Sequence, residues 1–119
     1  MAKTVAEKLL LKPGQTAALV GAPAGQQGLF AGTTIASAAS ADAVVVYGAT
    51  REALAKLLPG AVKALRTGAR LWVCYPKAGQ LGTDLSRDLL AKIVAAHGFE
   101  GVRLVAVDEV WSAMMFLRR

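Results

Sequence analysis

The chain is 119 residues long, with 55% hydrophobic and 18% charged residues and a formal net charge of +6. This length suits one domain, and the low charged fraction excludes an intrinsically disordered chain. The one cysteine, Cys74, excludes a disulfide framework and a multi-cysteine zinc site, and the one histidine, His97, leaves little for histidine-based chemistry. The composition therefore favours a single compact domain over residues 1–119.

The first part of the chain predicts a short helix, a strand and a loop. Thr4 and Glu7 have the spacing of a capping box, in which each side chain satisfies a free amide of the first helical turn. The helix is expected to end at Lys12-Pro13-Gly14, and an apolar strand follows over 16–20. A glycine-rich loop then covers 21–28, and the small residues of 33–41 could form a short helix.

The middle of the chain predicts a buried strand and a long helix. Residues 43–47 (AVVVY) form a β-branched run typical of a strand that is buried on both faces. Thr50 is expected to cap a helix whose apolar positions recur at helical spacing; they are Leu54, Leu57, Leu58, Ala61, Val62 and Leu65. Pro59-Gly60 predicts a kink or two short helices, and Gly68 is expected to cap the helix end.

The last part predicts a strand, a helix and a hairpin. A strand is expected over 69–75, and Ser86 is expected to cap a helix that ends at Gly98. Its expected buried residues are Leu89, Leu90, Ile93, Val94 and His97. Strands over 102–107 and 111–117 are separated by three residues, which predicts an antiparallel hairpin. We therefore predict a three-layer, Rossmann-like α/β domain of about five strands, mostly parallel with an antiparallel C-terminal strand.

The order of these parts resembles a class I methyltransferase domain. The resemblance rests on Leu-Leu-Leu-Lys-Pro-Gly before the first strand, Asp42 before AVVVY, Arg-Thr-Gly-Ala-Arg-Leu-Trp-Val at 66–73, and Gly98-Phe99 before the closing hairpin. It implies that the last strand inserts antiparallel between its two predecessors.

The sequence departs from that family at the S-adenosylmethionine site. The family's site resembles an acidic-G-x-G-x-G loop after the first strand, with an acidic residue that ends the second strand and binds the ribose. Residues 20–25 (VGAPAG) lack the acidic residue and the glycine spacing, and Pro23 removes an amide. The chain between Gly21 and Asp42 is too short for two further strands with their helices, and Asp42 stands at the start of a strand. We therefore expect no cofactor and no functional S-adenosylmethionine site.

A second resemblance is to a small, uncharacterised bacterial protein family of about this length. Its recurring features appear as Tyr75-Pro76-Lys77, Thr-Asp-Leu-Ser-Arg-Asp at 83–88, and Asp108 with Trp111-Ser112. This resemblance implies no particular activity.

A ligand site, if one exists, is expected at the carboxyl edge of the sheet, where strand ends and helix N-termini converge. The candidate binding residues there are Lys77, Tyr75, Arg87 and Trp111. Lys77 could hold a phosphate or carboxylate as a point charge, or could be a surface lysine on a mobile loop. Tyr75 could bind a ligand or satisfy its hydroxyl at the sheet edge. Arg87 could instead pair with Asp84, and Trp111 could serve packing.

Other reactive residue types are expected to be structural. Asp108 and Glu109 are expected to be solvated turn residues, and Cys74 a small buried hydrophobe. Asp84 could cap the start of the helix that follows it at Ser86. His97 has no second histidine with which to bind a metal, so we predict neither a metal site nor catalytic residues.

The expected partners follow from charge and hydropathy. No basic run with interleaved aromatic residues is present, so we expect no dedicated nucleic-acid role. No apolar run reaches membrane-spanning or signal-peptide length, which favours a cytoplasmic protein with no membrane role. The leading hypothesis is a non-catalytic interaction domain that could form a homo-oligomer. The alternative is a binder of, or a weakly specific enzyme for, an anionic or nucleotide-like small molecule.

Overall fold

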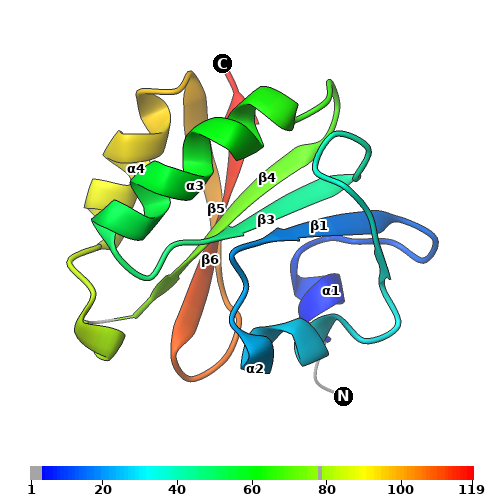
Figure 1. The fold of residues 1–119 in the computed structure, drawn as a ribbon, viewed down its shortest axis with the longest axis horizontal. Helices are drawn as coiled ribbons and strands as arrows, with labels where there is room; N and C mark the ends of the chain where they lie inside the picture. Colours follow the sequence, from blue (N-terminus) through cyan, green and yellow to red (C-terminus); the bar gives the residue numbers. More distant parts are fainter. Residues whose placement is uncertain (1–3, 78) are drawn as a thin grey trace.

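The computed structural model describes residues 4–77 and 79–119, and within them one six-stranded sheet carries helices on both sides (Figure 1). The strands are β1 (Thr16–Val20), β2 (Thr34–Ile35), β3 (Ala43–Tyr47), β4 (Arg70–Pro76), β5 (Phe99–Ala106) and β6 (Trp111–Arg118). The helices are α1 (Val5–Lys8), α2 (Ala24–Gln27), α3 (Arg51–Ala64) and α4 (Arg87–Ala95), with short 3₁₀ turns at η1 (Gly28–Phe30) and η2 (Gln80–Gly82).

The sheet has the strand order β2-β1-β3-β4-β6-β5. The first four strands of this order are parallel, whereas β6 runs antiparallel to both β4 and β5. The last strand of the chain therefore inserts between its two predecessors, as the methyltransferase resemblance implied. The predicted Rossmann-like class, mostly parallel with an antiparallel C-terminal strand, is confirmed.

The sheet has one strand more than the five that were predicted. The additional strand is β2, which lies within residues 33–41, where the sequence suggested a short helix. Thr34 pairs with Thr16 and Ile35 with Ala17, and the Ala36 amide donates to the Ala17 carbonyl at 2.9 Å. The helix interpretation was wrong because the two β-branched residues add to the free edge of β1, a choice that depends on a neighbour distant in sequence.

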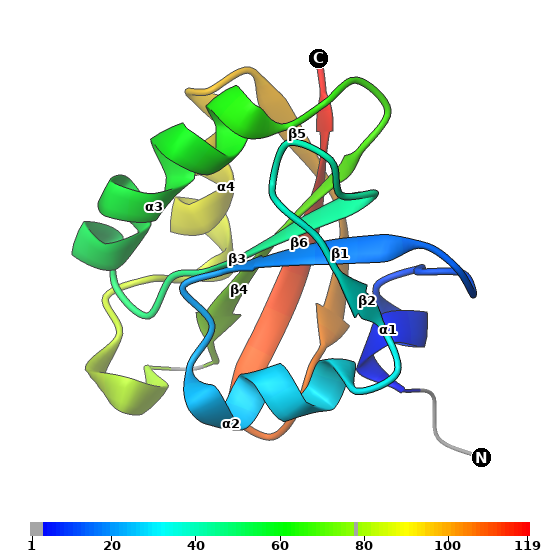
Figure 2. The same ribbon diagram turned by 45° about the vertical axis from the view of Figure 1, so that its right-hand side comes forward.

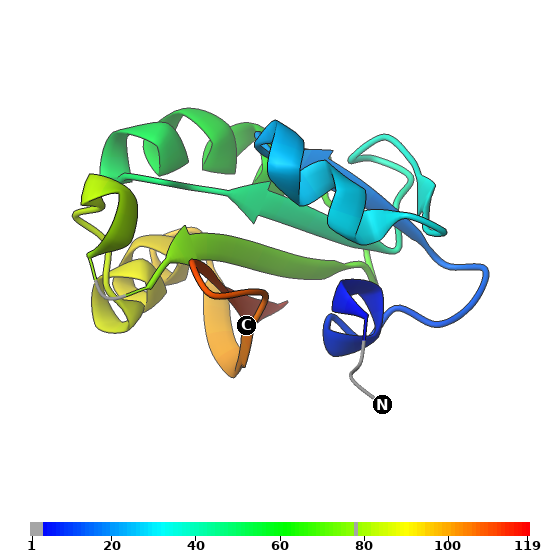
Figure 3. The ribbon, with the colours of Figure 1, turned by 90° about the horizontal axis from the view of Figure 1, so that it is seen from below.

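Helices lie on both faces of the sheet (Figure 2), and buried apolar side chains form a core on each face. On one face, α3 and α4 contribute Leu54, Leu58 and Leu90 to a core that includes Val46 and Phe116. On the other face, Val5 of α1 and Phe30 of η1 belong to a core that includes Leu9, Val45 of β3 and Trp72 of β4. The edge-on view in Figure 3 shows helices on both sides of the twisted sheet.

The predicted helix starts are confirmed by their caps. The Thr4 hydroxyl accepts from the Glu7 amide at 3.2 Å while the Glu7 carboxylate accepts from the Thr4 amide at 3.0 Å. The Thr50 hydroxyl accepts from the Ala53 amide, and that of Ser86 from the Leu89 amide, both at 3.2 Å.

Three predictions about the helices were wrong. Pro59 does not divide α3 into two short helices, because its apolar stripe remains packed on the sheet. The helix ends at Ala64, so Gly68 is not its cap but a left-handed turn residue with φ +88°. The predicted buried position of His97 was also wrong, because α4 ends at Ala95 and His97 is exposed in the following turn. None of the helices in the described residues is long and apolar enough to span a bilayer.

Candidate functional site at the carboxyl edge

The parallel strands β1, β3 and β4 end at one edge of the sheet, and the β5–β6 hairpin turn joins them there. At this edge Gly21 has φ +72°, and a Cβ at its position would lie 2.5 Å from Leu57 Cδ1. A glycine is therefore required where the chain leaves β1 and passes close to α3. Ligands of open α/β sheets bind at this edge, so its polar groups are the candidate ligand contacts.

Lys77 is tied to the hairpin turn by its backbone and its side chain. Its amide donates to the Val110 carbonyl at 2.7 Å, which continues the β4–β6 ladder, and its ammonium Nζ donates to the Asp108 carbonyl at 2.6 Å. The ammonium is part-buried in this contact. Both the backbone and the side-chain donor of Lys77 therefore contact the hairpin turn.

Asp108 organises that turn. Its Oδ1 accepts from the amides of Val110 and Trp111 at 2.8 and 2.7 Å, and its Oδ2 accepts from Gln26 Nε2 at 2.8 Å. Partial burial acts to raise the pKa of the Asp108 carboxyl, but the hydrogen bonds from Trp111, Gln26 and Val110, with the charge of Lys77, outweigh it and leave the pKa below its ordinary value.

A buried hydrogen-bonded chain continues from Asp108 across this face of the sheet. The Tyr47 hydroxyl donates to Gln26 Oε1 at 3.1 Å, and Gln26 is only 7% exposed. The Tyr47 ring meets Trp111 edge to face, with centroids 5.1 Å apart and the planes at 72°. Burial raises the pKa of the Tyr47 hydroxyl, so this group acts as a neutral donor. We call Gln26, Tyr47, Lys77, Asp108 and Trp111 the corner cluster.

Tyr75 and Arg87 lie on the opposite face of the sheet from Trp111. Tyr75 belongs to the core beneath α3 and α4, whereas Trp111 belongs to the core beneath α1. Burial raises the pKa of the Tyr75 hydroxyl, while the nearby charge of Arg87 acts to lower it. Trp111 lies opposite Pro76, so it is on the other face from Tyr75, because successive strand residues point to opposite faces. Lys77, past the end of β4, reaches the hairpin turn through its hydrogen bonds to Val110 and Asp108.

Asp84 caps α3. Its Oδ1 accepts from the Arg51 amide at 2.8 Å, so its carboxylate occupies the N-terminus of that helix. The alternative pairing of Asp84 with Arg87 is not formed, and Arg87 instead lies 3.7 Å from the Asp88 carboxylate at an exposed position.

The remaining candidates have structural environments. Burial raises the pKa of the Cys74 thiol to about 12, so this residue is a neutral hydrophobe as predicted. Asp42 precedes β3 at the opposite, amino-terminal edge, where its carboxylate accepts from the Thr16 amide at 2.8 Å and pairs with Arg66. Residues 4–77 and 79–119 contain no cluster of three or more potential metal ligands.

Gln26 is the residue of this edge that the sequence did not indicate. A glutamine in a polar loop is usually exposed, and its burial depends on Tyr47 and Asp108, which are 21 and 82 residues away. The turn role of Asp108 was predicted, but its contact with Gln26 could not be.

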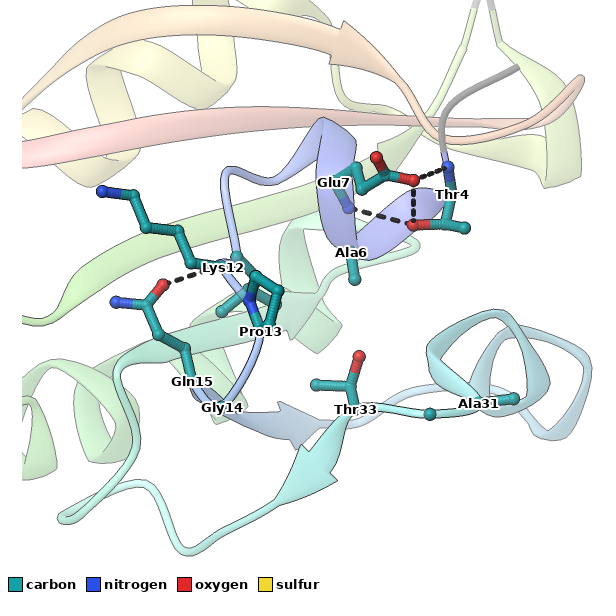
Figure 4. Close-up of a pocket in the computed structure, with 11 residues that line it drawn as sticks. Thr4, Ala6, Glu7, Lys12, Pro13, Gly14, Gln15, Ala31 and Thr33 are labelled. Atoms are coloured by element: carbon teal, nitrogen blue, oxygen red, sulfur yellow. Dashed lines mark hydrogen bonds between the residues drawn. The ribbon is translucent and has the colours of Figure 1, made fainter. Parts of the chain in front are cut away.

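Several hollows lie away from this edge. One of about 350 Å³ lies between α1, the loop before β1 and the loop before β2, and its lining includes Ala6, Lys12, Pro13, Gln15 and Thr33 (Figure 4). Another, of about 320 Å³, lies between α4 and the start of β5. Neither hollow includes a residue of the corner cluster.

No family model and no curated protein matches the chain. Among solved structures it is similar to ribosomal protein L11 methylase from Lactobacillus delbrueckii subsp. bulgaricus, with a TM-score of 0.61, 13% identity, and coverage of 97% of this chain and 75% of the other. It is also similar to the Bacillus subtilis m1A22 tRNA methyltransferase TrmK, with a TM-score of 0.58, 11% identity, and coverage of 100% and 67%.

A third similar structure is magnesium protoporphyrin IX methyltransferase from Synechocystis with bound S-adenosylmethionine, with a TM-score of 0.56, 13% identity, and coverage of 97% and 74%. At these identities the likeness concerns the path of the chain. It agrees with the strand order and with the inserted antiparallel strand. The chain therefore has a methyltransferase-like Rossmann fold.

Proposed function

We propose that this chain is a cytoplasmic, non-catalytic interaction domain with a methyltransferase-like Rossmann fold and without a functional S-adenosylmethionine site. We also assign it to the small bacterial family suggested by its Tyr75-Pro76-Lys77 and Trp111-Ser112 motifs. The observation that carries the functional proposal is that Lys77 and Gln26 at the carboxyl edge hydrogen-bond to Asp108 of the same chain.

The first support is the corner cluster. The Lys77 ammonium, the best candidate for an anion contact, already donates to the Asp108 carbonyl at 2.6 Å. Gln26 lies between Tyr47 and Asp108 and uses both its amide oxygen and its amide nitrogen there. A ligand would have to displace these part-buried hydrogen bonds, which costs free energy before any new contact forms.

The second support is the N-terminus of α3. Free amides at a helix N-terminus attract anions, but here the Asp84 carboxylate accepts from the Arg51 amide at 2.8 Å. An incoming phosphate would meet a negative charge at that position. The Asp84 carboxylate of the chain itself therefore occupies the position at which an anionic ligand would bind.

The third support concerns the strand beside β1. In the methyltransferase pattern, an acidic residue at the end of this strand binds the ribose. Here β2 ends at Ile35, whose side chain is 54% exposed, and residues 36–41 are alanine and serine only. The chain thus shares the path of the solved methyltransferases while an apolar side chain stands where a ribose ligand is needed.

A thermal-shift screen with S-adenosylmethionine, S-adenosylhomocysteine, nucleotides and phosphorylated metabolites tests this proposal. A ligand at 100 times its Kd would add about 2.7 kcal/mol to the free energy of unfolding. We expect no ligand to raise the melting temperature.

The alternative, an anion-binding site at this edge, predicts a clear shift that Lys77→Ala or Arg87→Ala removes. The matched control is Lys63→Ala, an exposed lysine in the last turn of α3. A shift that disappears in either edge variant but persists in the control would replace our proposal with that alternative.

A further inference from the structure

The strand β5 forms one border of the sheet, and within the described residues its outer side has no strand partner. Six of its eight residues are exposed. An exposed strand of this length presents unpaired amides and carbonyls to which another strand can add.

Exposed apolar side chains gather at this border. The described residues include five large hydrophobic side chains that are exposed, and three of them lie on β5 and its neighbour β6: Val102, Leu104 and Leu117, at 46%, 43% and 47%. Leu104 lies opposite Met114, whereas Leu117 lies three residues further along β6, so apolar side chains are exposed on both faces of this border.

A β-bulge gives the border a self-complementary charge pattern. Residues three apart in a regular strand point to opposite faces. The register shift between Gly101 and Arg103 instead puts Glu100 opposite Leu117 and Arg103 opposite Met115, two residues apart on β6. Glu100 and Arg103 therefore share one face, and neither forms an ion pair within residues 4–77 and 79–119.

We propose that β5 pairs antiparallel with β5 of a second copy of this chain, about a two-fold axis between Gly101 and Val102. This register sets Glu100 of each copy opposite Arg103 of the other. The sheet would continue through the dimer as twelve strands, twice the six of one chain.

Two observations describe the surroundings of Gly101. A Cβ on residue 101 would lie 2.9 Å from Met114 Sδ, so glycine leaves room for the Met114 side chain to cover the centre of the strand. The hollow beside Gly101 is lined by Ala91, Lys92 and Ala95 of α4 and by Arg119. This inference deepens the proposed function, on which it rests, by naming the partner.

Sedimentation equilibrium on the full chain and its charge variants tests the pairing. The wild type is expected to dimerise. Glu100→Arg and Arg103→Glu each create two like-charge pairs across the axis and should raise the dimer dissociation constant roughly thirtyfold. The double variant E100R/R103E restores opposite charges and should return the constant to within about threefold of wild type.

The matched control is Glu109→Arg, which makes the same charge change on the exposed hairpin turn and should leave the dimer unchanged. A wild type that stays monomeric, or a dimer that the single variants do not weaken, overturns the inference. Rescue by the double variant also excludes misfolding as the cause of the single-variant effects. Binding of S-adenosylmethionine would instead contradict the proposed function, so the two failures are distinguishable.

Discussion

Asp108 shows how one side chain fixes the carboxyl edge. Its two oxygens accept three hydrogen bonds, two from the amides of its own turn and one from Gln26. The turn contacts are local, and aspartate is typical of such turns, so they could be predicted. The bond from Gln26 could not, because no local pattern indicates which distant polar group a carboxylate meets.

Replacing Asp108 with alanine should destabilise the protein by about 2 kcal/mol, because charge-assisted hydrogen bonds are lost and Nε2 of the buried Gln26 loses its acceptor. Urea denaturation measures this change. Glu109→Ala, at the exposed neighbouring position, should stay within about 0.5 kcal/mol of wild type. Equal effects of the two substitutions would contradict the role assigned to Asp108.

The depressed pKa of Asp108 also predicts a pH dependence. The folded state binds the proton less tightly than the unfolded chain, so this carboxyl stabilises the fold above its ordinary pKa of 3.8 and loses that contribution as the pH falls through the lower, folded value. Asp42, whose pKa is lowered chiefly by the Thr16 amide against some desolvation, acts in the same direction.

The free energy of unfolding should therefore fall as the pH is lowered below about 4. Asp108→Asn keeps an oxygen that can accept from the turn amides, and it should flatten part of this decline while the part due to Asp42 remains. Denaturation midpoints measured from pH 7 to pH 2 would show this difference. Parallel curves for the two proteins would count against it.

At the scale of elements, strong local sequence patterns predicted the helices and strands correctly, and weak patterns did not. The β-branched run of β3 and the caps and apolar faces of α3 and α4 are local sequence features, and the structure confirms these elements. Pro59 did not break α3, because the residues on both sides of it, Leu58 and Ala61, are buried on the sheet. The strand β2 has two residues and no periodicity, so only its pairing with β1 defines it.

Two glycine substitutions, one inside α3 and one after β1, are expected to have opposite effects on stability. Gly60→Ala should stabilise the protein by about 0.5–1 kcal/mol, because Gly60 is exposed within the helix and nothing lies within 4 Å of the point that an alanine Cβ would occupy. Gly21→Ala should destabilise it, since φ is +72° and the new methyl would meet Leu57. Thermal unfolding of both variants checks the pair, and a Gly60→Ala variant less stable than wild type would argue for a break in α3.

At the scale of the whole molecule, the order of the elements predicted the fold, whereas the functional proposal depends on side-chain contacts at one edge. The inserted β6 and the parallel strands follow the path of the solved methyltransferases. At the carboxyl edge, Gln26 and Lys77 bond to Asp108, and Asp84 bonds to the Arg51 amide; these contacts support the proposal that no cofactor binds there. Fold and site were thus predictable to different degrees, because backbone pairing follows repeated local patterns while a site depends on a few long-range side-chain contacts.

The most direct test of the proposal that no cofactor binds at the carboxyl edge is a nuclear magnetic resonance titration of the ¹⁵N-labelled protein with S-adenosylmethionine. The amides of Gly21, Arg51, Lys77 and Trp111 report on both faces of the carboxyl edge, and we predict that none of them shifts at millimolar cofactor. Saturable shifts confined to these amides would show that the cofactor binds there and would contradict the account.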